Sequence, residues 1–381
     1  MSRTGLSVWI SANTCWYVAN FRSRLIEELI SRGYSVTVLS PADSYVSRIR
    51  ALGADHRHIP MVNDSINPFR EIVLLARFIW HLALGRPDVL LTFTPKPNIY
   101  GSIAGALFGI PVVPTINGLG RAFAVQSFVT LAVKTLYWWA LRSPAKIYFQ
   151  NEDDRSLFVS EGLVDPARTE RIPGSGVDIE RFSPVARAER EGGCVFLLVA
   201  RLLWDKGIGE FVEAARLVKR EFPNTEFHVV GFLGVQNPSA IPRETVEEWV
   251  AEGVIRYLGA SDDVREHYAR ADCVVLPTTF REGVPRVLLE AASMALPVIT
   301  TDVPGCRDVV EDGVTGLICR PRDAQDLAAK IRQFLVMSPE DRAAMGRAGR
   351  QRVVARFDER MVIDRYLGEI ERICCERLEL V

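Results

Sequence analysis

Two basic residues, Arg201 and Lys206, stand where the chain passes from an expected strand to an expected helix. The apolar run at 194–200 is typical of a buried strand, and the residues that follow have the apolar spacing of a helix. Cations beside the free N–H groups of a helix N-terminus form a diphosphate site that needs no metal ion. Two solvated surface charges would show the same spacing. The position of the turn, at the end of a buried strand, favours a ligand site.

A second turn carries two glutamates, Glu282 and Glu290, around the sequence G-V-P-R-V-L-L. Gly283 leaves the backbone free to approach a ligand, and Pro285 suits the first turn of a helix that begins near Val284. Free N–H groups at that helix start would hold a phosphate, while carboxylates accept hydrogen bonds from sugar hydroxyls. The two turns together predict a site for a sugar joined to a diphosphate.

The elements that position these turns are strands and helices in strict alternation. Short Val/Ile/Leu-rich runs are typical of buried parallel strands, and a helix is expected at 19–32. The alternation pauses at 171–193, which is rich in Gly, Pro and charge, and then resumes. We therefore predict two doubly wound α/β domains that join near residue 175, with ligands in a cleft between them. The predicted strands are 6–11, 34–40, 88–93, 111–116, 145–150, 194–200, 226–232, 254–259, 272–277 and 297–300.

The turn after the first strand argues against two common nucleotide-binding enzymes. It reads ISANTCWYVANF and has no glycine, so the G-x-G-x-x-G turn of dinucleotide-binding domains is missing. No G-x-x-x-x-G-K-[ST] loop occurs either. An NAD-dependent oxidoreductase and a P-loop kinase are both disfavoured.

The amino-acid composition argues against further classes of protein. The 381 residues are 48% hydrophobic and carry a formal net charge of −1, which argues against bulk binding to nucleic acid. The seven cysteines are odd in number and form no C-x2-C pair, so neither a disulfide framework nor a zinc site is expected. No signal peptide and no apolar run long enough to span a bilayer are found. These features predict a cytosolic chain with no metal and no cofactor.

At this point the sequence resembles the retaining GT-B glycosyltransferases of glycosyltransferase family 4, over essentially its whole length. The segment from Glu282 to Glu290 looks like the E-x7-E motif of that family, and Arg201 with Lys206 looks like its diphosphate-binding pair. More narrowly, TPKPNIYG and INGLGRAF resemble bacterial members that act on undecaprenyl-diphosphate-linked sugars, including N-acetylgalactosaminyltransferases. Further similar stretches are 149–164, 171–182 and 302–331.

The resemblance implies a GT-B fold with two Rossmann-like domains and an interdomain cleft. Residues 1–174 would form an acceptor-binding domain to which a C-terminal helix, 360–381, crosses back, and residues 175–359 would bind the nucleotide-sugar. It also implies metal-independent, retaining transfer in which the leaving diphosphate helps to deprotonate the attacking hydroxyl. A UDP-linked N-acetylhexosamine is the expected donor.

The first group of donor-binding residues implied by the resemblance surrounds the diphosphate and the sugar. Arg201 and Lys206 would neutralise the diphosphate, and Glu282 would contact hydroxyls of the sugar. The backbone N–H groups of Gly283 and Val284 would bind beside them.

The second group surrounds the nucleoside. Pro285 belongs to the same donor-binding motif, and Glu290 would bind the ribose. The backbone at Tyr257 and Leu258 would flank the base.

One departure from the family concerns the acceptor side. Many members place a histidine after a strand of the first domain, whereas this sequence has Asn117 there, followed by Gly118. Asn117 can hydrogen-bond a sugar but cannot act as a base, and Asn-Gly is also a common turn. The expected catalytic residues are Arg201, Lys206, Glu282 and Asn117.

The expected acceptor is a lipid-linked saccharide of bacterial surface-glycan assembly, so we looked for a membrane face. In 126–140 one helical stripe is polar and the opposite stripe is apolar, with basic residues around it. The polar stripe is Gln126, Thr130 and Lys134; the apolar one is Phe128, Ala132, Leu136 and Trp139. The basic residues are Arg121, Lys134, Arg142 and Lys146. Residues 76–86 offer a second apolar-aromatic face, although core helices could show both patterns.

These expectations place the protein in the cytoplasm, peripherally on the cytoplasmic face of the inner membrane. The alternatives are a non-catalytic nucleotide-sugar or lipid-glycan binding protein of the same fold, and a transferase that uses a GDP-sugar. The intact set of charged residues favours an enzyme, because a binding protein would not need charges that act only in the transition state.

Overall fold

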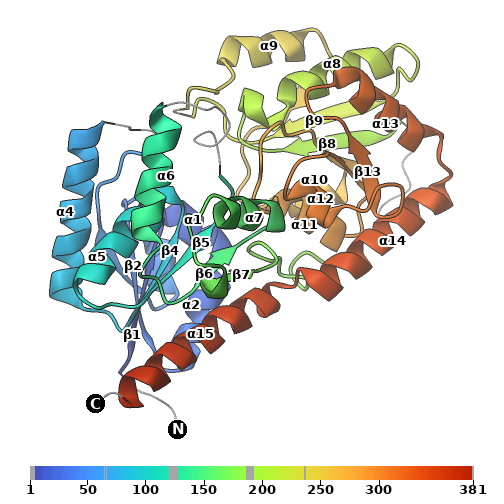
Figure 1. The fold of residues 1–381 in the computed structure, drawn as a ribbon. Helices are drawn as coiled ribbons and strands as arrows, with labels where there is room; N and C mark the ends of the chain where they lie inside the picture. The colour runs from blue at the N-terminus through green and yellow to red at the C-terminus, as the bar shows by residue number, and fades with distance from the viewer. Residues whose placement is uncertain are drawn as a thin grey trace. The chain divides into compact units, whose positions relative to one another are not determined.

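The computed structural model describes residues 5–379 apart from 64, 66, 120–127, 186–192 and 236; of residues 128, 129 and 377–379 it describes the backbone alone. The chain forms two compact units, which divide after Ser175 and before Arg360. The C-terminal residues from Arg360 onward belong to the N-terminal unit. Each unit is a parallel sheet with helices on both faces (Figure 1).

The N-terminal unit is built on a seven-stranded sheet with the order β3-β2-β1-β4-β5-β6-β7. Every neighbouring pair of strands is parallel. The central strands are buried along almost their whole length, as expected for a sheet that is covered on both sides. The strands are β1 (Ser7–Ser11), β2 (Ser35–Ser40), β3 (Asp55–His58), β4 (Val89–Phe93), β5 (Val112–Ile116), β6 (Ile147–Phe149) and β7 (Thr169–Arg171).

Two hydrophobic cores cover the two faces of this sheet. One contains side chains of α1 (Cys15–Phe21), α2 (Ser23–Ser31), α3 (Val46–Ala51) and α15 (Glu359–Glu379). The other contains side chains of α4 (Pro68–Gly85), the π-helix η1 (Pro97–Gly101), α5 (Ser102–Leu107), α6 (Phe128–Ala140) and α7 (Glu152–Ser160). The predicted return of the C-terminal helix to the first domain is confirmed, since Tyr366 of α15 hydrogen-bonds Thr115 of β5 over 2.7 Å.

The predicted single helix at 19–32 is wrong, because two helices replace it. Helix α1 ends at Phe21, α2 begins at Ser23, and Arg22 between them leaves the helical conformation with a φ of −134°. The break lets the Arg22 guanidinium turn inward, where it lies 4.2 Å from the ring centre of Phe93 and donates to the Tyr17 hydroxyl. Arginine stacks well on aromatic faces, and this contact stabilises the break.

The C-terminal unit has a six-stranded parallel sheet with the order β10-β9-β8-β11-β12-β13. Its strands are β8 (Val195–Val199), β9 (Glu226–Val230), β10 (Arg256–Tyr257), β11 (Cys273–Leu276), β12 (Val298–Thr301) and β13 (Gly316–Cys319). One face is covered by α8 (Ile208–Lys219), α9 (Arg243–Ala251) and α13 (Ala324–Val336). The other is covered by α10 (Arg265–Ala269), α11 (Arg286–Ser293), α12 (Cys306–Val309) and α14 (Pro339–Arg356).

Short 3-10 helices complete the described elements: η3 (Pro166–Arg168) and η4 (Trp204–Lys206). Within the described residues, no helix combines the length and the apolar character that crossing a bilayer requires.

Candidate active site

The carboxyl ends of β8 and β11 mark the point in the C-terminal sheet where the strand order reverses. Strand β9 follows β8 on one side, and β11 lies on the other. The loops that leave β8 and β11 therefore diverge toward opposite faces of the sheet. In open parallel sheets ligands bind at such a point. Both predicted motif turns lie here.

The turn after β8 carries the two predicted cations. Arg201 stands two residues after the end of β8 and is exposed; among the described residues its side chain has no ion-pair partner. Lys206 ends the short helix η4, and Gly207 then caps α8 with a φ of +75°. A side chain on Gly207 would collide with the carbonyl of Pro277, so only glycine lets this turn lie against the end of β11.

That close approach brings Lys206 to Glu282. Their Nζ and Oε1 atoms are 2.5 Å apart, with 22% and 18% of the two side chains exposed. The Thr278 hydroxyl donates to the same carboxylate oxygen over 3.0 Å and also lies 3.2 Å from the Asp205 carbonyl, which links the two turns. An ammonium group has three donors, and the ion pair uses one of them. Lys206 can therefore hold Glu282 and an anion together.

The backbone of the second turn is fixed from the side of β12. The Glu282 N–H donates to the carbonyl of Pro304 over 3.2 Å. Gly305 has a φ of +83°, and a side chain there would collide with the carbonyl of Gly283. The predicted ligand-binding turn, with Gly283 and Val284, is thus held rigidly between two strand ends.

Helix α11 begins two residues later than predicted. Val284 and Pro285 are both outside it, and Pro285 is its N-cap in an extended conformation with ψ at 115°. The first helical residue is Arg286. Pro285 thus lies just before the helix and not in its first turn as predicted. The fixed φ of proline suits both positions.

Glu290 is one turn into α11 and is almost buried. Arg286 donates from Nε to one carboxylate oxygen and the Tyr268 hydroxyl donates to the other, both over 3.0 Å. Burial raises the pKa of Glu290, while the charge of Arg286 and the hydrogen bonds from Tyr268 and Arg286 act in the opposite direction. Two oxygens with about four acceptor sites still leave room for a ribose hydroxyl.

The residues predicted to flank the base follow a different strand. Tyr257 ends β10 and donates its hydroxyl to the Gly231 carbonyl over 2.9 Å. The Leu258 N–H donates to Val229 over 2.9 Å, which leaves its carbonyl and its half-exposed side chain to contact a ligand. Strand β10 is separated from β8 by β9.

Asn117 belongs to the N-terminal unit, directly after β5. Its side-chain amide donates to the Tyr17 hydroxyl over 2.6 Å. Its Oδ1 atom is buried and has no hydrogen-bond partner among the described residues. A buried acceptor without a partner is uncommon and is often found at functional sites.

Three residues of the C-terminal site were not predicted: Thr278, Tyr268 and Arg286. Arg286 could have been found, because it lies four residues before Glu290 on one helix, where such a pair is in contact. Thr278 and Tyr268 meet their partners only through the fold. No set of three or more His, Cys, Asp and Glu side chains in the described part of the chain is arranged to hold a metal ion.

Comparisons with known proteins identify the family of each compact unit. The family model "Glycosyl transferase 4-like domain" matches residues 18–174, and "Glycosyl transferases group 1" matches residues 180–352, so each compact unit has its own model. A Campylobacter jejuni protein is 27% identical over 93% of this chain and 96% of its own length. It is an N,N'-diacetylbacillosaminyl-diphospho-undecaprenol alpha-1,3-N-acetylgalactosaminyltransferase.

A second relative and two solved structures extend the comparison. UDP-Gal:alpha-D-GlcNAc-diphosphoundecaprenol alpha-1,3-galactosyltransferase of Escherichia coli is 27% identical over 70% of each chain. HepE of Anabaena, solved with UDP and glucose, shares the fold with a TM-score of 0.76 at 18% identity, over 96% of this chain and 99% of its own. Sucrose-phosphate synthase of Thermosynechococcus elongatus has a TM-score of 0.79 at 19% identity, over 98% of this chain and 100% of its own. The chain belongs to the glycosyltransferases of family 4 and has the GT-B fold.

Proposed function

We propose that this glycosyltransferase moves a sugar from a nucleotide diphosphate to a polyprenyl-diphosphate-linked saccharide, with retention of the anomeric configuration. The observation that carries the proposal is the Lys206–Glu282 ion pair beside Arg201, at the point where the strand order reverses. A cation of the kind that binds phosphate and a carboxylate of the kind that binds sugar hydroxyls are thus within one hydrogen bond of each other.

The proposed reaction needs no residue that acts as a separate base. The bond between the anomeric carbon and the phosphate oxygen breaks, and its electron pair leaves with the diphosphate. The acceptor hydroxyl forms the new bond on the same face and gives its proton to the departing phosphate oxygen. Arg201 and Lys206 stabilise the charge that develops there, and Glu282 holds the sugar in place.

The donor that we propose is a UDP-linked N-acetylhexosamine. The name of the C. jejuni relative specifies an N-acetylgalactosaminyltransferase, the name of the E. coli relative specifies UDP, and HepE was solved with UDP. In this chain the ribose would add a hydrogen bond to Glu290, which Arg286 and Tyr268 already orient.

The proposed acceptor requires contact with the cytoplasmic face of the inner membrane. On α6, Trp139 is exposed, Leu136 is half-buried against the core, and Thr130 is buried. The guanidinium of Arg142 lies 3.6 Å from the ring centre of Trp138, which keeps a cation beside the exposed aromatic side chain. The exposed Trp139 with a cation beside it supports a membrane face, whereas Leu136 packs partly against the core and Thr130, predicted for the polar stripe, is buried. Arg121, Gln126 and the side chain of Phe128, which were predicted to belong to it, lie outside the described residues.

The test is a transfer assay with purified protein, a UDP-N-acetylhexosamine and a polyprenyl-diphosphate-linked saccharide, with and without EDTA. We expect release of UDP and a product whose new linkage keeps the anomeric configuration of the donor, in both conditions. A lack of turnover with every UDP- and GDP-sugar would favour a binding protein. An inverted linkage would exclude the same-face mechanism, and loss of activity in EDTA would exclude metal independence.

A further inference from the structure

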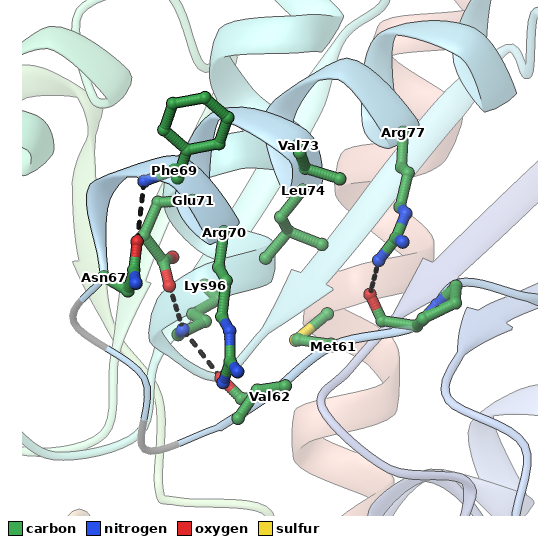
Figure 2. Close-up of a pocket in the computed structure, with 11 residues that line it drawn as sticks. Met61, Val62, Asn67, Phe69, Arg70, Glu71, Val73, Leu74, Arg77 and Lys96 are labelled. Carbon is green, nitrogen blue, oxygen red and sulfur yellow. Dashed lines mark hydrogen bonds and ion pairs between the residues drawn. The ribbon is translucent and has the colours of Figure 1, made fainter.

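A pocket of about 370 Å³ opens between the first turns of α4 and the segment that follows β3 (Figure 2). Its wall is largely apolar and includes Met61, Val62, Phe69, Val73 and Leu74. Figure 2 shows Val73 and Leu74 on α4, with Leu74 pointing toward Met61. Apolar walls of this kind suit a hydrocarbon ligand.

The outer face of α4 continues this apolar character along the helix. Phe69, Val73, Trp80 and Leu84 are spaced by four or seven residues and are all exposed, from 41% to 80%. The opposite face packs into the core through Leu74, Phe78 and Leu82. A helix that is apolar on both faces requires an apolar environment on the second one as well.

The charged groups at the pocket favour an anionic occupant. Three cations, Arg70, Arg77 and Lys96, line it together with one acid, Glu71, which gives a net charge of +2. Lys96 is held in place by Glu71 over 2.5 Å and by two carbonyl groups. Arg77 donates to the carbonyl of Pro60 and keeps further donors, and Arg70 is exposed. Two arginines at the mouth of an apolar pocket match a phosphate joined to a hydrocarbon.

The pocket also lies close to the end of the sheet where the acceptor is expected. Lys96 stands between β4 and the π-helix η1, two residues before Asn98. The Asn98 amide donates to the Thr115 carbonyl in β5 over 2.8 Å, and Asn117 follows two residues later. The chain thus links the wall of the pocket directly to the proposed acceptor residue.

We infer that this pocket binds the first isoprene units of the acceptor lipid, with the diphosphate at Arg70 and Arg77 and the saccharide directed toward Asn117. The inference rests on the proposed function and adds a subsite to it. The exposed stripe of α4 would then lie in the membrane surface, so that the lipid chain passes from the bilayer into the pocket without crossing water.

The test compares two tryptophan substitutions on neighbouring residues of α4. Val73→Trp fills the pocket, whereas Ile72→Trp adds the same side chain at an exposed position that does not line it. Each variant is assayed with an undecaprenyl-diphosphate saccharide and with the same saccharide on methyl diphosphate. We expect Val73→Trp to raise KM for the undecaprenyl acceptor about tenfold, which corresponds to roughly two methylene groups left unburied. KM for the methyl acceptor should not change, and Ile72→Trp should alter neither value.

An equal effect of both substitutions, or an equal rise for both acceptors, would overturn the inference. A second measurement on the unmodified protein covers the case in which Val73→Trp does not fold. A photoreactive polyprenyl phosphate should cross-link within 60–77 and be displaced by undecaprenyl phosphate but not by phosphatidylglycerol vesicles. Equal displacement by phosphatidylglycerol would assign the pocket to bulk lipid, and cross-linking elsewhere would also reject it. Cross-linking needs no turnover, so it tests the pocket independently of the proposed activity. The assay with the methyl acceptor tests that activity independently of the pocket.

Discussion

The two sheets have the same parallel design, but the segments after their central strands carry different chemistry. After β8 and β11, charged side chains are tied to each other in the pairs Lys206–Glu282 and Arg286–Glu290. Among the described residues that directly follow β4 and β5, Lys96, which pairs with Glu71 of α4, is charged and the other polar side chains are neutral. Side-chain oxygens of Thr94, Asn98 and Asn117, and of Thr92 within β4, are buried and have no hydrogen-bond partner among the described residues.

This difference separates the two substrates. A cluster of paired charges can exchange one partner for a diphosphate and stay neutralised, which suits the donor. Buried oxygens without partners cost about 1–3 kcal/mol each, and hydroxyl or amide groups of a saccharide would satisfy them at little electrostatic cost. We therefore propose that the C-terminal unit binds the donor and the N-terminal unit the acceptor, and each prediction below tests one side of this division.

The largest effect on activity is expected among the paired charges that follow β8 and β11. Lys206→Ala removes a charge-assisted contact to the diphosphate and leaves Glu282 without its ion pair, so kcat/KM should fall about a hundredfold. Steady-state kinetics with a UDP-sugar would measure it. Lys219→Ala is the matched control, because it removes a lysine at the other end of α8 that donates only to the Gly253 carbonyl. Similar losses in both variants would place the diphosphate elsewhere.

A smaller effect with a different signature is expected for Glu282→Gln. The amide keeps the size of the side chain but loses the charge that accepts strong hydrogen bonds from the sugar, so kcat should fall about thirtyfold. The Kd for UDP, measured by calorimetry, should stay close to that of the parent protein. A large change in the UDP Kd together with an unchanged kcat would mean that Glu282 contacts the phosphates and not the sugar.

Asn117→Ala tests the neutral side chains that follow β4 and β5. The loss of one neutral hydrogen bond to the acceptor should raise the acceptor KM about fivefold and leave the donor KM unchanged. Kinetics with the methyl diphosphate acceptor, in which each substrate is varied while the other is saturating, would separate the two constants. A rise in the donor KM alone would contradict the assignment of Asn117 to the acceptor.

The smallest effect concerns stability and pH. Burial raises the pKa of Glu290, so the folded protein binds its proton more tightly than the unfolded chain does. The stabilisation from this group is present below its unfolded pKa and is lost as pH rises through the folded one. Relative to Glu290→Gln, the parent should therefore lose unfolding free energy over the pH range that begins at about 4, near the unfolded pKa of a glutamate, and extends upward. Urea denaturation across this range would show it, and a gain in relative stability would mean that Arg286 outweighs burial.

Both motif turns and the buried strands other than β13, which reads G-L-I-C, could be predicted from the sequence, because each depends on local pattern. The strand β3 could not, since its sequence D-H-R-H is polar, and β7 reads T-E-R. Both lie at the edges of the N-terminal sheet, where a strand needs no apolar run. The break at Arg22 was missed for a related reason: the aromatic rings that hold it come from β4 and the helices around it.

The candidate site was predictable only in part. The motif residues stand out by spacing, but the orientation of Glu290 depends on Tyr268, a contact between α10 and α11 that no local pattern marks. The unpartnered oxygens of Thr94 and Asn98 were also invisible in the sequence. They follow from the π-helix η1 and from a φ of +71° at Thr94, which is strained for a residue other than glycine.

The most direct test of the central claim is a calorimetric titration of UDP into Lys206→Ala and Asn117→Ala. The division of substrates between the units predicts that Lys206→Ala weakens UDP binding at least about tenfold, the scale of one charge-assisted contact, while Asn117→Ala binds UDP within about twofold of the parent. If Lys206→Ala binds UDP as the parent does, or if Asn117→Ala is the variant that loses it, the assignment of the donor to the charged end of the C-terminal sheet is wrong.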